Sequence, residues 1–145
     1  MSCSQGYPAF HDAEGKSVPV SEFKGKWIIV NYWATWCDIC LDEIPELNRL
    51  YRNNHDKNIL IYGVNYDQLS PVGLKNTVRK MKIRFPVLAE DPSQMWQLDE
   101  ITNLPTTFII NPRGEVVKKI VGGPNTETSL LELVHALQSN TAQSM

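Results

Sequence analysis

The fold of this chain is decided by the stretch Asn31-Tyr32-Trp33-Ala34-Thr35-Trp36-Cys37-Asp38-Ile39-Cys40. The apolar run from Trp27 to Trp33 is typical of a central β-strand that is covered on both faces. It leads through three residues into two cysteines spaced C-x-x-C, and a helical pattern begins at once. This order of strand and helix places both thiols at the start of a helix.

The start of a helix favours thiolate chemistry. N–H groups in the first turn have no partners within the helix, and their partial positive charge stabilises a thiolate relative to a thiol. Cys37 is therefore the expected nucleophile. Cys40 lies about one turn further on nearly the same face, so it can attack a mixed disulfide formed at Cys37 and release the reduced substrate.

The helix is predicted to run from about Cys37 to Asn53. Pro45 removes one hydrogen bond and bends the axis, but the helical pattern continues beyond it. The spacing i, i+4, i+7 and i+11 predicts one buried stripe on this helix, made by Cys40, Ile44, Leu47 and Tyr51.

The remaining segments continue an α/β pattern. A second apolar run at 58–65 predicts a parallel strand–helix–strand crossover. We further expect a short strand within 16–20, a helix beginning near Ser70 and a short strand at 85–88. A short helix capped by Ser93, an antiparallel hairpin over 106–121 and a last helix capped by Thr126 complete the pattern.

Two separated motifs resemble the thioredoxin superfamily. They are Trp-Ala-Thr-Trp-Cys-x-x-Cys, with Pro45 beyond it, and Leu104-Pro105-Thr106-Thr107-Phe108, which is similar to the cis-proline loop of that superfamily. Asn31 departs from thioredoxin, which has a buried aspartate there, and so does the Asp38-Ile39 dipeptide. Glu43 and the run at 104–114 resemble the TlpA/ResA/DsbE group more closely. The resemblance covers residues 16–138.

The resemblance implies a thioredoxin-like α/β fold, in which helices flank a central mixed β-sheet, with a TlpA-type helix–strand insertion between Asp67 and Glu100. It also implies a thiol–disulfide oxidoreductase that exchanges a Cys37–Cys40 disulfide with protein substrates and needs no cofactor beyond that disulfide. The group works outside the cytoplasm as a reductant, and several members serve cytochrome c maturation. A membrane electron donor of the DsbD/CcdA type and a monomeric state are expected on the same grounds.

Four further residues are candidates for the site, and a fifth, Asp38, affects the redox potential. Trp36 is expected to form an apolar lip over the sulfurs, or else simply to pack. Leu104 and Pro105 would pair with an extended substrate segment beside Cys37. Glu43, three residues after Cys40, would carry a raised pKa and relay a proton to or from Cys40, or else be a surface glutamate in an acidic helix. Asp38 opposes a thiolate at its neighbour Cys37, which predicts a potential on the reducing side.

Alternative functions remain open from the residues alone. A general disulfide oxidase or isomerase would use the same cysteines. A non-enzymatic module that binds metal or haem would need further ligands, whereas His11, His55 and His135 are single and scattered, so no metal site is expected. A peroxidase is disfavoured, because Ala34 stands where peroxiredoxins have threonine.

Bulk properties predict one thioredoxin-like domain over residues 1–145, with a loose lead-in at 1–15 and a frayed tail at 139–145. Fourteen basic and sixteen acidic residues give a net charge of −2 without like-charged runs, so nothing points to nucleic acid. No signal-peptide or membrane-spanning pattern is visible, which leaves an extracytoplasmic and a cytoplasmic location open. Cys3 is either an incidental thiol or the lipid-bearing residue of a trimmed lipoprotein.

Overall fold

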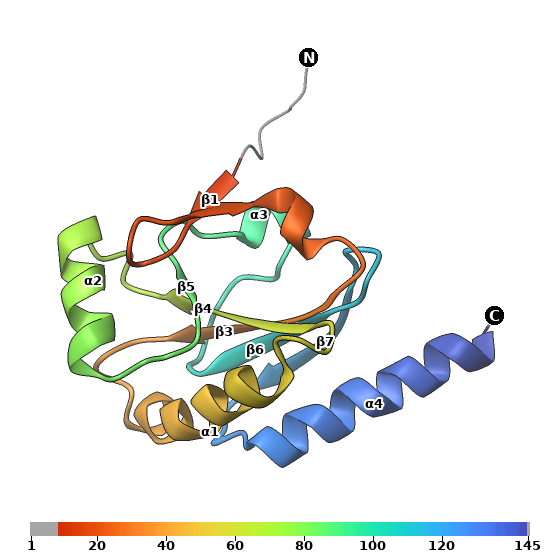
Figure 1. Cartoon of the computed structure of the whole chain (residues 1–145). Coiled ribbons are helices and arrows are strands. Elements are labelled where there is room, and N and C mark those ends of the chain that lie inside the picture. The colour runs from red at the N-terminus through yellow and green to blue at the C-terminus, as the bar shows by residue number, and fades with distance from the viewer. Residues whose placement is uncertain (1–8, 145) are drawn as a thin grey trace.

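A five-stranded mixed β-sheet forms the centre of the computed structural model, which describes residues 9–144 (Figure 1). Cys3 lies outside the described residues. The elements, in chain order, are β1 (Ala9–His11), β2 (Ser17–Pro19), the 3₁₀ helix η1 (Val20–Phe23), β3 (Trp27–Trp33), α1 (Asp38–Asn54), β4 (Ile59–Asn65), α2 (Pro71–Lys80), β5 (Val87–Leu88), α3 (Ser93–Trp96), β6 (Thr106–Ile110), β7 (Val116–Val121) and α4 (Glu127–Ser144).

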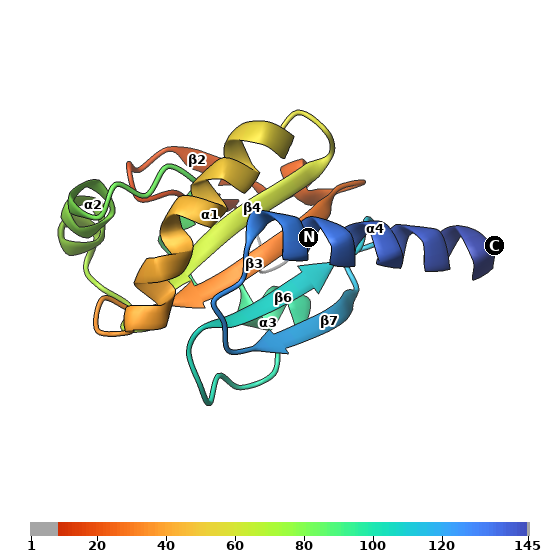
Figure 2. The same cartoon turned by 90° about the horizontal axis from the view of Figure 1, so that it is seen from below.

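The sheet has the order β5-β4-β3-β6-β7. Strands β3, β4 and β5 are parallel, whereas β6 is antiparallel to both β3 and β7. Helices α1 and α4 cover one face of the sheet, and α3 lies on the other with the segment from β1 to η1 (Figures 1 and 2). This arrangement confirms the predicted thioredoxin-like fold and the parallel crossover from β3 through α1 to β4.

Strand β3 lies in the middle of the sheet, and all seven of its residues are buried. One set of its side chains, including Ile29, packs into a core beneath α1, α2 and α4. The other set, including Val30 and Tyr32, packs into a second core with Phe23 and Trp96. A strand held on both faces and both edges is a rigid support for the loop that follows it.

Helix α1 begins as predicted, with Cys37 in the N-cap position and Pro45 inside the helix. It ends at Asn54, within one residue of the expected end. The buried stripe differs at its C-terminal end, because Leu50 is fully buried and Tyr51 is only partly so. The bend expected at a proline does not interrupt the helix.

Three local expectations differ from the structure. The lead-in becomes regular at Ala9, because β1 pairs with β2 and Phe10 packs against Phe23. Helix α4 continues through the expected frayed tail to Ser144, since a helix propagates readily once begun. Ser93 lies inside α3 rather than capping it, and the backbone N–H of Ser93 donates to Asp91.

The two edges of the sheet differ in their cover. At the β5 edge, the backbone N–H of Ala89 donates to the carbonyl of His11, so the β1 segment lies alongside. Strand β7 forms the other edge and carries Lys118 and Lys119 in its middle. Its valines at 116, 117 and 121 are partly exposed.

Candidate active site

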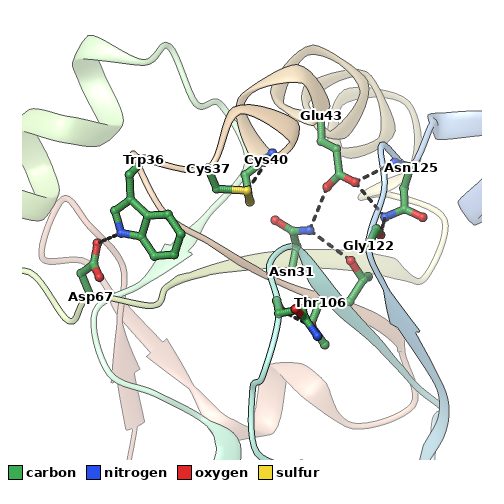
Figure 3. The surroundings of a disulfide bond; sticks show 11 residues. Asn31, Trp36, Cys37, Cys40, Glu43, Asp67, Thr106, Gly122 and Asn125 are labelled. Carbon is green, nitrogen blue, oxygen red and sulfur yellow. Dashed lines mark hydrogen bonds between the residues drawn. A yellow bond between two sulfur atoms is a disulfide. The ribbon is translucent and has the colours of Figure 1, made fainter.

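Cys37 and Cys40 form a disulfide at the N-terminus of α1 (Figure 3). Their Cα atoms are 5.2 Å apart. The backbone N–H of Cys40 points at the Sγ atom of Cys37, at 3.2 Å. This N–H is one of the unpaired donors of the first helical turn, and in the reduced protein it is placed to stabilise a thiolate on Cys37.

The two cysteines differ in access to solvent. Cys37 is 8% exposed and Cys40 is 2% exposed. An incoming disulfide therefore reaches Cys37 more readily than Cys40, which lies deeper in the protein. This difference fits the predicted division between nucleophile and resolving thiol.

Trp36 projects beside the disulfide instead of packing into the core. It is 62% exposed, which excludes the simple packing role. Its indole Nε1–H donates to Oδ2 of Asp67 at 2.9 Å, so the connection after β4 fixes the ring (Figure 3). Trp36 and Leu104 line one open cavity of about 310 Å³, whose other walls are Tyr66, Ile101, Thr102 and Asn103.

The peptide bond between Leu104 and Pro105 is cis. Pro105 is buried, and β6 begins at the next residue. The carbonyl of Pro105 accepts a hydrogen bond from the backbone N–H of Gly122 at 2.7 Å. The loop before β6 is thereby joined to the loop that follows β7.

Glu43 is a buried carboxyl, with 0% of its surface exposed, so the alternative of a surface glutamate is excluded. Its Oε1 accepts a hydrogen bond from Asn31 Nδ2 at 3.1 Å. Its Oε2 accepts from the backbone N–H of Asn125 at 2.6 Å and from Asn125 Nδ2 at 2.8 Å. Burial raises the pKa of Glu43 above its ordinary value, and these hydrogen bonds partly oppose that rise.

Asn31 and Asn125 reach Glu43 from distant parts of the chain. Asn31, on β3, also donates to Thr107 Oγ1 on β6 at 3.1 Å. Sequence reasoning singled out Asn31 only as a departure from thioredoxin and did not single out Asn125. A polar residue after Gly-Gly-Pro is typical of a turn, so no local signal identifies Asn125 as a partner of Glu43.

The histidines lie elsewhere. Nδ1 of His11 lies 2.8 Å from Oε2 of Glu90, and the ring of His55 stacks on Tyr51. Within residues 9–144, no three His, Cys, Asp or Glu side chains are grouped in a way that would hold a metal ion. The candidate site thus consists of the disulfide, Trp36, Leu104, Pro105 and Glu43.

This fold, with its disulfide at a helix N-terminus and a cis-proline immediately before β6, defines a thioredoxin-like thiol–disulfide oxidoreductase. A model of the AhpC/TSA family matches residues 6–119. The chain therefore belongs to the AhpC/TSA family, as a thiol–disulfide oxidoreductase of the ResA type.

Two relatives show the same assignment. The chain is 32% identical over 141 residues to the thiol–disulfide oxidoreductase ResA of Bacillus subtilis (strain 168), covering 94% of this chain and 78% of that protein. It is 34% identical over 116 residues to a ResA of Bacillus cereus, covering 80% of this chain and 66% of that protein. The chain thus spans about two thirds of the length of the second relative.

A solved structure has the same architecture. The thiol:disulfide interchange protein of the thioredoxin family from Chlorobium tepidum TLS superposes with a TM-score of 0.73 at 27% sequence identity. The match covers 94% of this chain and 97% of that chain. It therefore extends over nearly all of the elements described above.

Proposed function

We propose that this protein reduces disulfides in protein substrates outside the cytoplasm. The thiolate of reduced Cys37 attacks one sulfur of a substrate disulfide, which forms a mixed disulfide and releases the first substrate thiol. Cys40 then attacks Cys37 Sγ and releases the second substrate thiol. The substrate gains two electrons and two protons, and the protein is left with the Cys37–Cys40 disulfide.

The observation that carries this proposal is the geometry of the pair. Cys37 is the more exposed cysteine and receives a helix N–H on its sulfur, while Cys40 is almost fully buried one turn behind it. The more accessible of the two sulfurs, stabilised as a thiolate, suits attack on a large partner. A buried second thiol suits the resolving step, because it can reach the sulfur of Cys37 and little else.

Glu43 supports the second half of the exchange. Cys40 must lose its proton before it can attack, and an unperturbed thiol holds its proton at neutral pH. Glu43 lies one turn beyond Cys40 on α1, and burial raises its pKa, so its carboxylate accepts a proton more readily than an ordinary carboxylate does. We assign Glu43 the role of proton relay for Cys40.

Substrate docking involves Trp36, Leu104 and Pro105. Trp36 and Leu104 already share a cavity of about 310 Å³, which a protein segment can enter. The backbone at Leu104 precedes a strand, so an extended substrate can pair with it by strand addition. Trp36 offers a large aromatic surface that would become buried in such a complex.

The similarity to ResA proteins supports the proposed direction and setting of the reaction. Asp38 disfavours the neighbouring thiolate, which makes the dithiol a stronger reductant. A membrane electron donor of the DsbD/CcdA type would return the protein to its dithiol form, and apocytochrome c is the proposed substrate class. The protein acts as a monomer without a cofactor.

No described helix has both the length and the hydropathy needed to cross a bilayer.

The test is the reduction potential of the pair. We would equilibrate the protein with glutathione buffers and follow the tryptophan fluorescence, to which Trp36 contributes, with Cys40→Ser as the control that cannot form the disulfide. A potential near or below the roughly −270 mV of thioredoxin supports a reductant. A value towards the roughly −120 mV of the oxidant DsbA would replace this proposal with disulfide insertion.

A further inference from the structure

The loop at residues 122–125 lies between Glu43 and the cis-proline loop. On one side, the N–H of Gly122 donates to the carbonyl of Pro105 at 2.7 Å. On the other side, Asn125 gives both its backbone N–H and its side-chain amide to Oε2 of Glu43. Figure 3 shows Glu43 pointing from α1 towards Asn31 and Asn125.

We propose that Asn125 is a positioning residue for the exchange reaction: it fixes the orientation of the Glu43 carboxyl and keeps this buried group able to ionise. The proposal rests on the proposed function, because Asn125 affects the exchange reaction only if Glu43 is its proton relay. Asn125 itself touches neither the substrate nor the sulfurs in this assignment.

The contacts of Asn125 suit a charged carboxylate. Both of its N–H groups donate to one oxygen, at 2.6 and 2.8 Å, and Asn31 donates to the other. Such donors favour the ionised form, whereas complete burial favours the neutral form. The side-chain amide of Asn125 is also held by the carbonyl of Gly122, at 3.3 Å. The donor is therefore already oriented, and its hydrogen bond to Glu43 needs little reorganisation.

The groups around the Glu43 carboxyl come from three elements besides α1. Strand β3 presents the amide of Asn31, strand β6 presents the hydroxyl of Thr107 behind it, and the loop after β7 presents Asn125. The titratable neighbours on α1 are Cys40 and Glu46, one turn to either side. Glu46 is turned to the N-terminus of α4, where it accepts the N–H of Glu127. Asn125 is thus a principal polar contact of this carboxyl.

A merely structural role is the competing explanation, and Asn111 provides the matched control. Asn111 is also a buried asparagine in a loop beside the sheet, and its side chain binds Arg113 and Glu115 within the β6–β7 turn. Replacing either asparagine by alanine removes loop hydrogen bonds. Only the replacement of Asn125 removes a donor from Glu43.

The experiment measures the pKa of Glu43 by carbon-detected NMR titration of its side-chain carboxyl in the oxidised protein. Wild type is compared with Asn125→Ala, Asn125→Asp and Asn111→Ala. The alanine variant at 125 loses one donor, so the pKa of Glu43 should rise by about one pH unit. The aspartate variant should raise it further, because a second carboxylate then faces the first. Asn111→Ala should leave the pKa unchanged.

A second measurement follows the resolution of a Cys37 mixed disulfide against pH in the same proteins and in Glu43→Gln. The pH profile should move upward with the pKa of Glu43 in both Asn125 variants. If Glu43→Gln has the wild-type profile, the proton relay fails, while the NMR shifts still test Asn125. An unchanged pKa of Glu43 in Asn125→Ala and in the nearly isosteric Asn125→Asp overturns the positioning role.

Discussion

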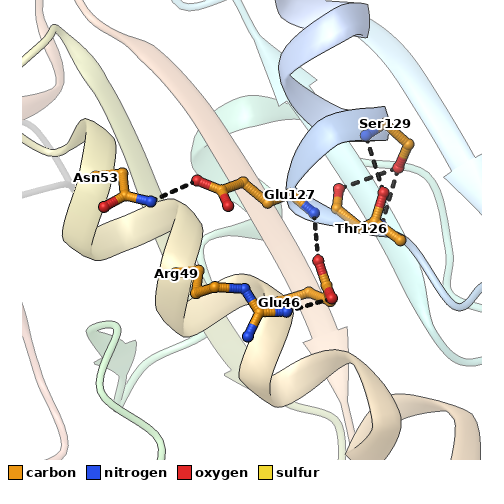
Figure 4. Close-up of polar contacts among 6 residues, drawn as sticks. All are labelled: Glu46, Arg49, Asn53, Thr126, Glu127 and Ser129. Atoms are coloured by element: carbon orange, nitrogen blue, oxygen red, sulfur yellow. Dashed lines mark hydrogen bonds and ion pairs between the residues drawn. The ribbon is translucent and has the colours of Figure 1, made fainter.

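Glu46 on α1 caps α4: its Oε1 accepts a hydrogen bond from the backbone N–H of Glu127, the first residue of that helix, at 2.9 Å (Figure 4). Glu46 also pairs with Arg49, and Glu127 accepts from Asn53 Nδ2 at 2.8 Å. The capping contact holds the pKa of Glu46 below its usual range. Three residues earlier on the same helix, Glu43 binds the N–H of Asn125. Two glutamates of α1 therefore hold the segment that enters α4.

Glu46→Ala should loosen the start of α4. The N–H of Glu127 loses its acceptor, so its amide hydrogen exchange should become faster, and the melting temperature should fall. Arg49→Ala is the control, because it removes an exposed ion-pair partner and leaves the cap in place. Equal exchange rates at Glu127 in Glu46→Ala and Arg49→Ala would contradict the capping role.

Glu43→Gln should change how stability depends on pH. The pKa of Glu43 is raised in the folded protein, so between the ordinary value of 4.5 and the folded value the native state holds a proton that the unfolded state has lost. The unfolding free energy of wild type therefore falls across this window as pH rises, by up to about 1.4 kcal/mol per pH unit. The glutamine variant should lack this fall.

The measurement for Glu43→Gln is guanidinium unfolding of the oxidised proteins between pH 4 and 8. Glu14, Glu46 and Glu115 have lowered pKa values and act in the opposite sense, because their stabilisation is lost as pH falls. These groups are present in both proteins, so the difference between the two curves reports on Glu43. Parallel curves above pH 4.5 would be incompatible with a raised pKa.

Gly123→Ala should disrupt the contact between the loop and Glu43. A Cβ atom at Gly123 would collide with Oε2 of Glu43 and lie 3.2 Å from Cγ of Pro105. The carboxylate cannot move aside without losing its hydrogen bonds to Asn125, so we expect a loss of about 2–3 kcal/mol in unfolding free energy. Gly73→Ala, in the first turn of α2, is the control: its Cβ would lie 3.1 Å from Ser70 Oγ, the end of a short side chain, so it should cost less than Gly123→Ala. A neutral Gly123→Ala would show that the loop can move away freely.

Much of this site follows from the sequence. The apolar run of β3, the C-x-x-C spacing and the stripe of α1 identify the helix that carries the cysteines, because these signals are local and periodic. The strand that follows Pro105 was predicted for the same reason. Both lie in segments where local preference and tertiary packing agree.

The rest depends on contacts between distant segments. Glu43 lies in a helix rich in acids, and its sequence neighbours do not reveal that Asn125, 82 residues away, covers it. Strand β1 has no periodicity of its own and exists through its pairing with β2. Trp36 could be assigned to packing or to a lip until its exposure and its bond to Asp67 were known.

Cys40→Ser should trap substrates on Cys37. The mixed disulfide forms but has no resolving thiol, so turnover should fall to background while covalent complexes accumulate on non-reducing gels. Cys37→Ser should trap almost none, because the remaining Cys40 is buried. Equal trapping by the two variants would show that either thiol can attack first.

Trp36→Ala should weaken substrate docking without changing the chemistry. Truncating an exposed aromatic anchor should raise the KM for a protein disulfide about tenfold, while the reduction potential stays close to wild type. Asp67→Ala, which frees the indole, should raise KM by a smaller factor. Asp67→Asn keeps an acceptor for Nε1 and serves as the control. A KM that is identical in all four proteins removes Trp36 from the docking surface.

The lysines of β7 affect whether molecules associate through this edge of the sheet at high protein concentration. An outer strand with partly exposed valines is a template on which a second molecule can extend the sheet, which is a common beginning of aggregation. Lys119 is paired with Asp99 at 3.5 Å, whereas Lys118 is exposed. In an antiparallel pairing of two such strands centred on this position, Lys118 of each copy would lie near that of the other, and the like charges would repel. A lysine in the middle of an exposed outer strand therefore opposes association through that edge of the sheet.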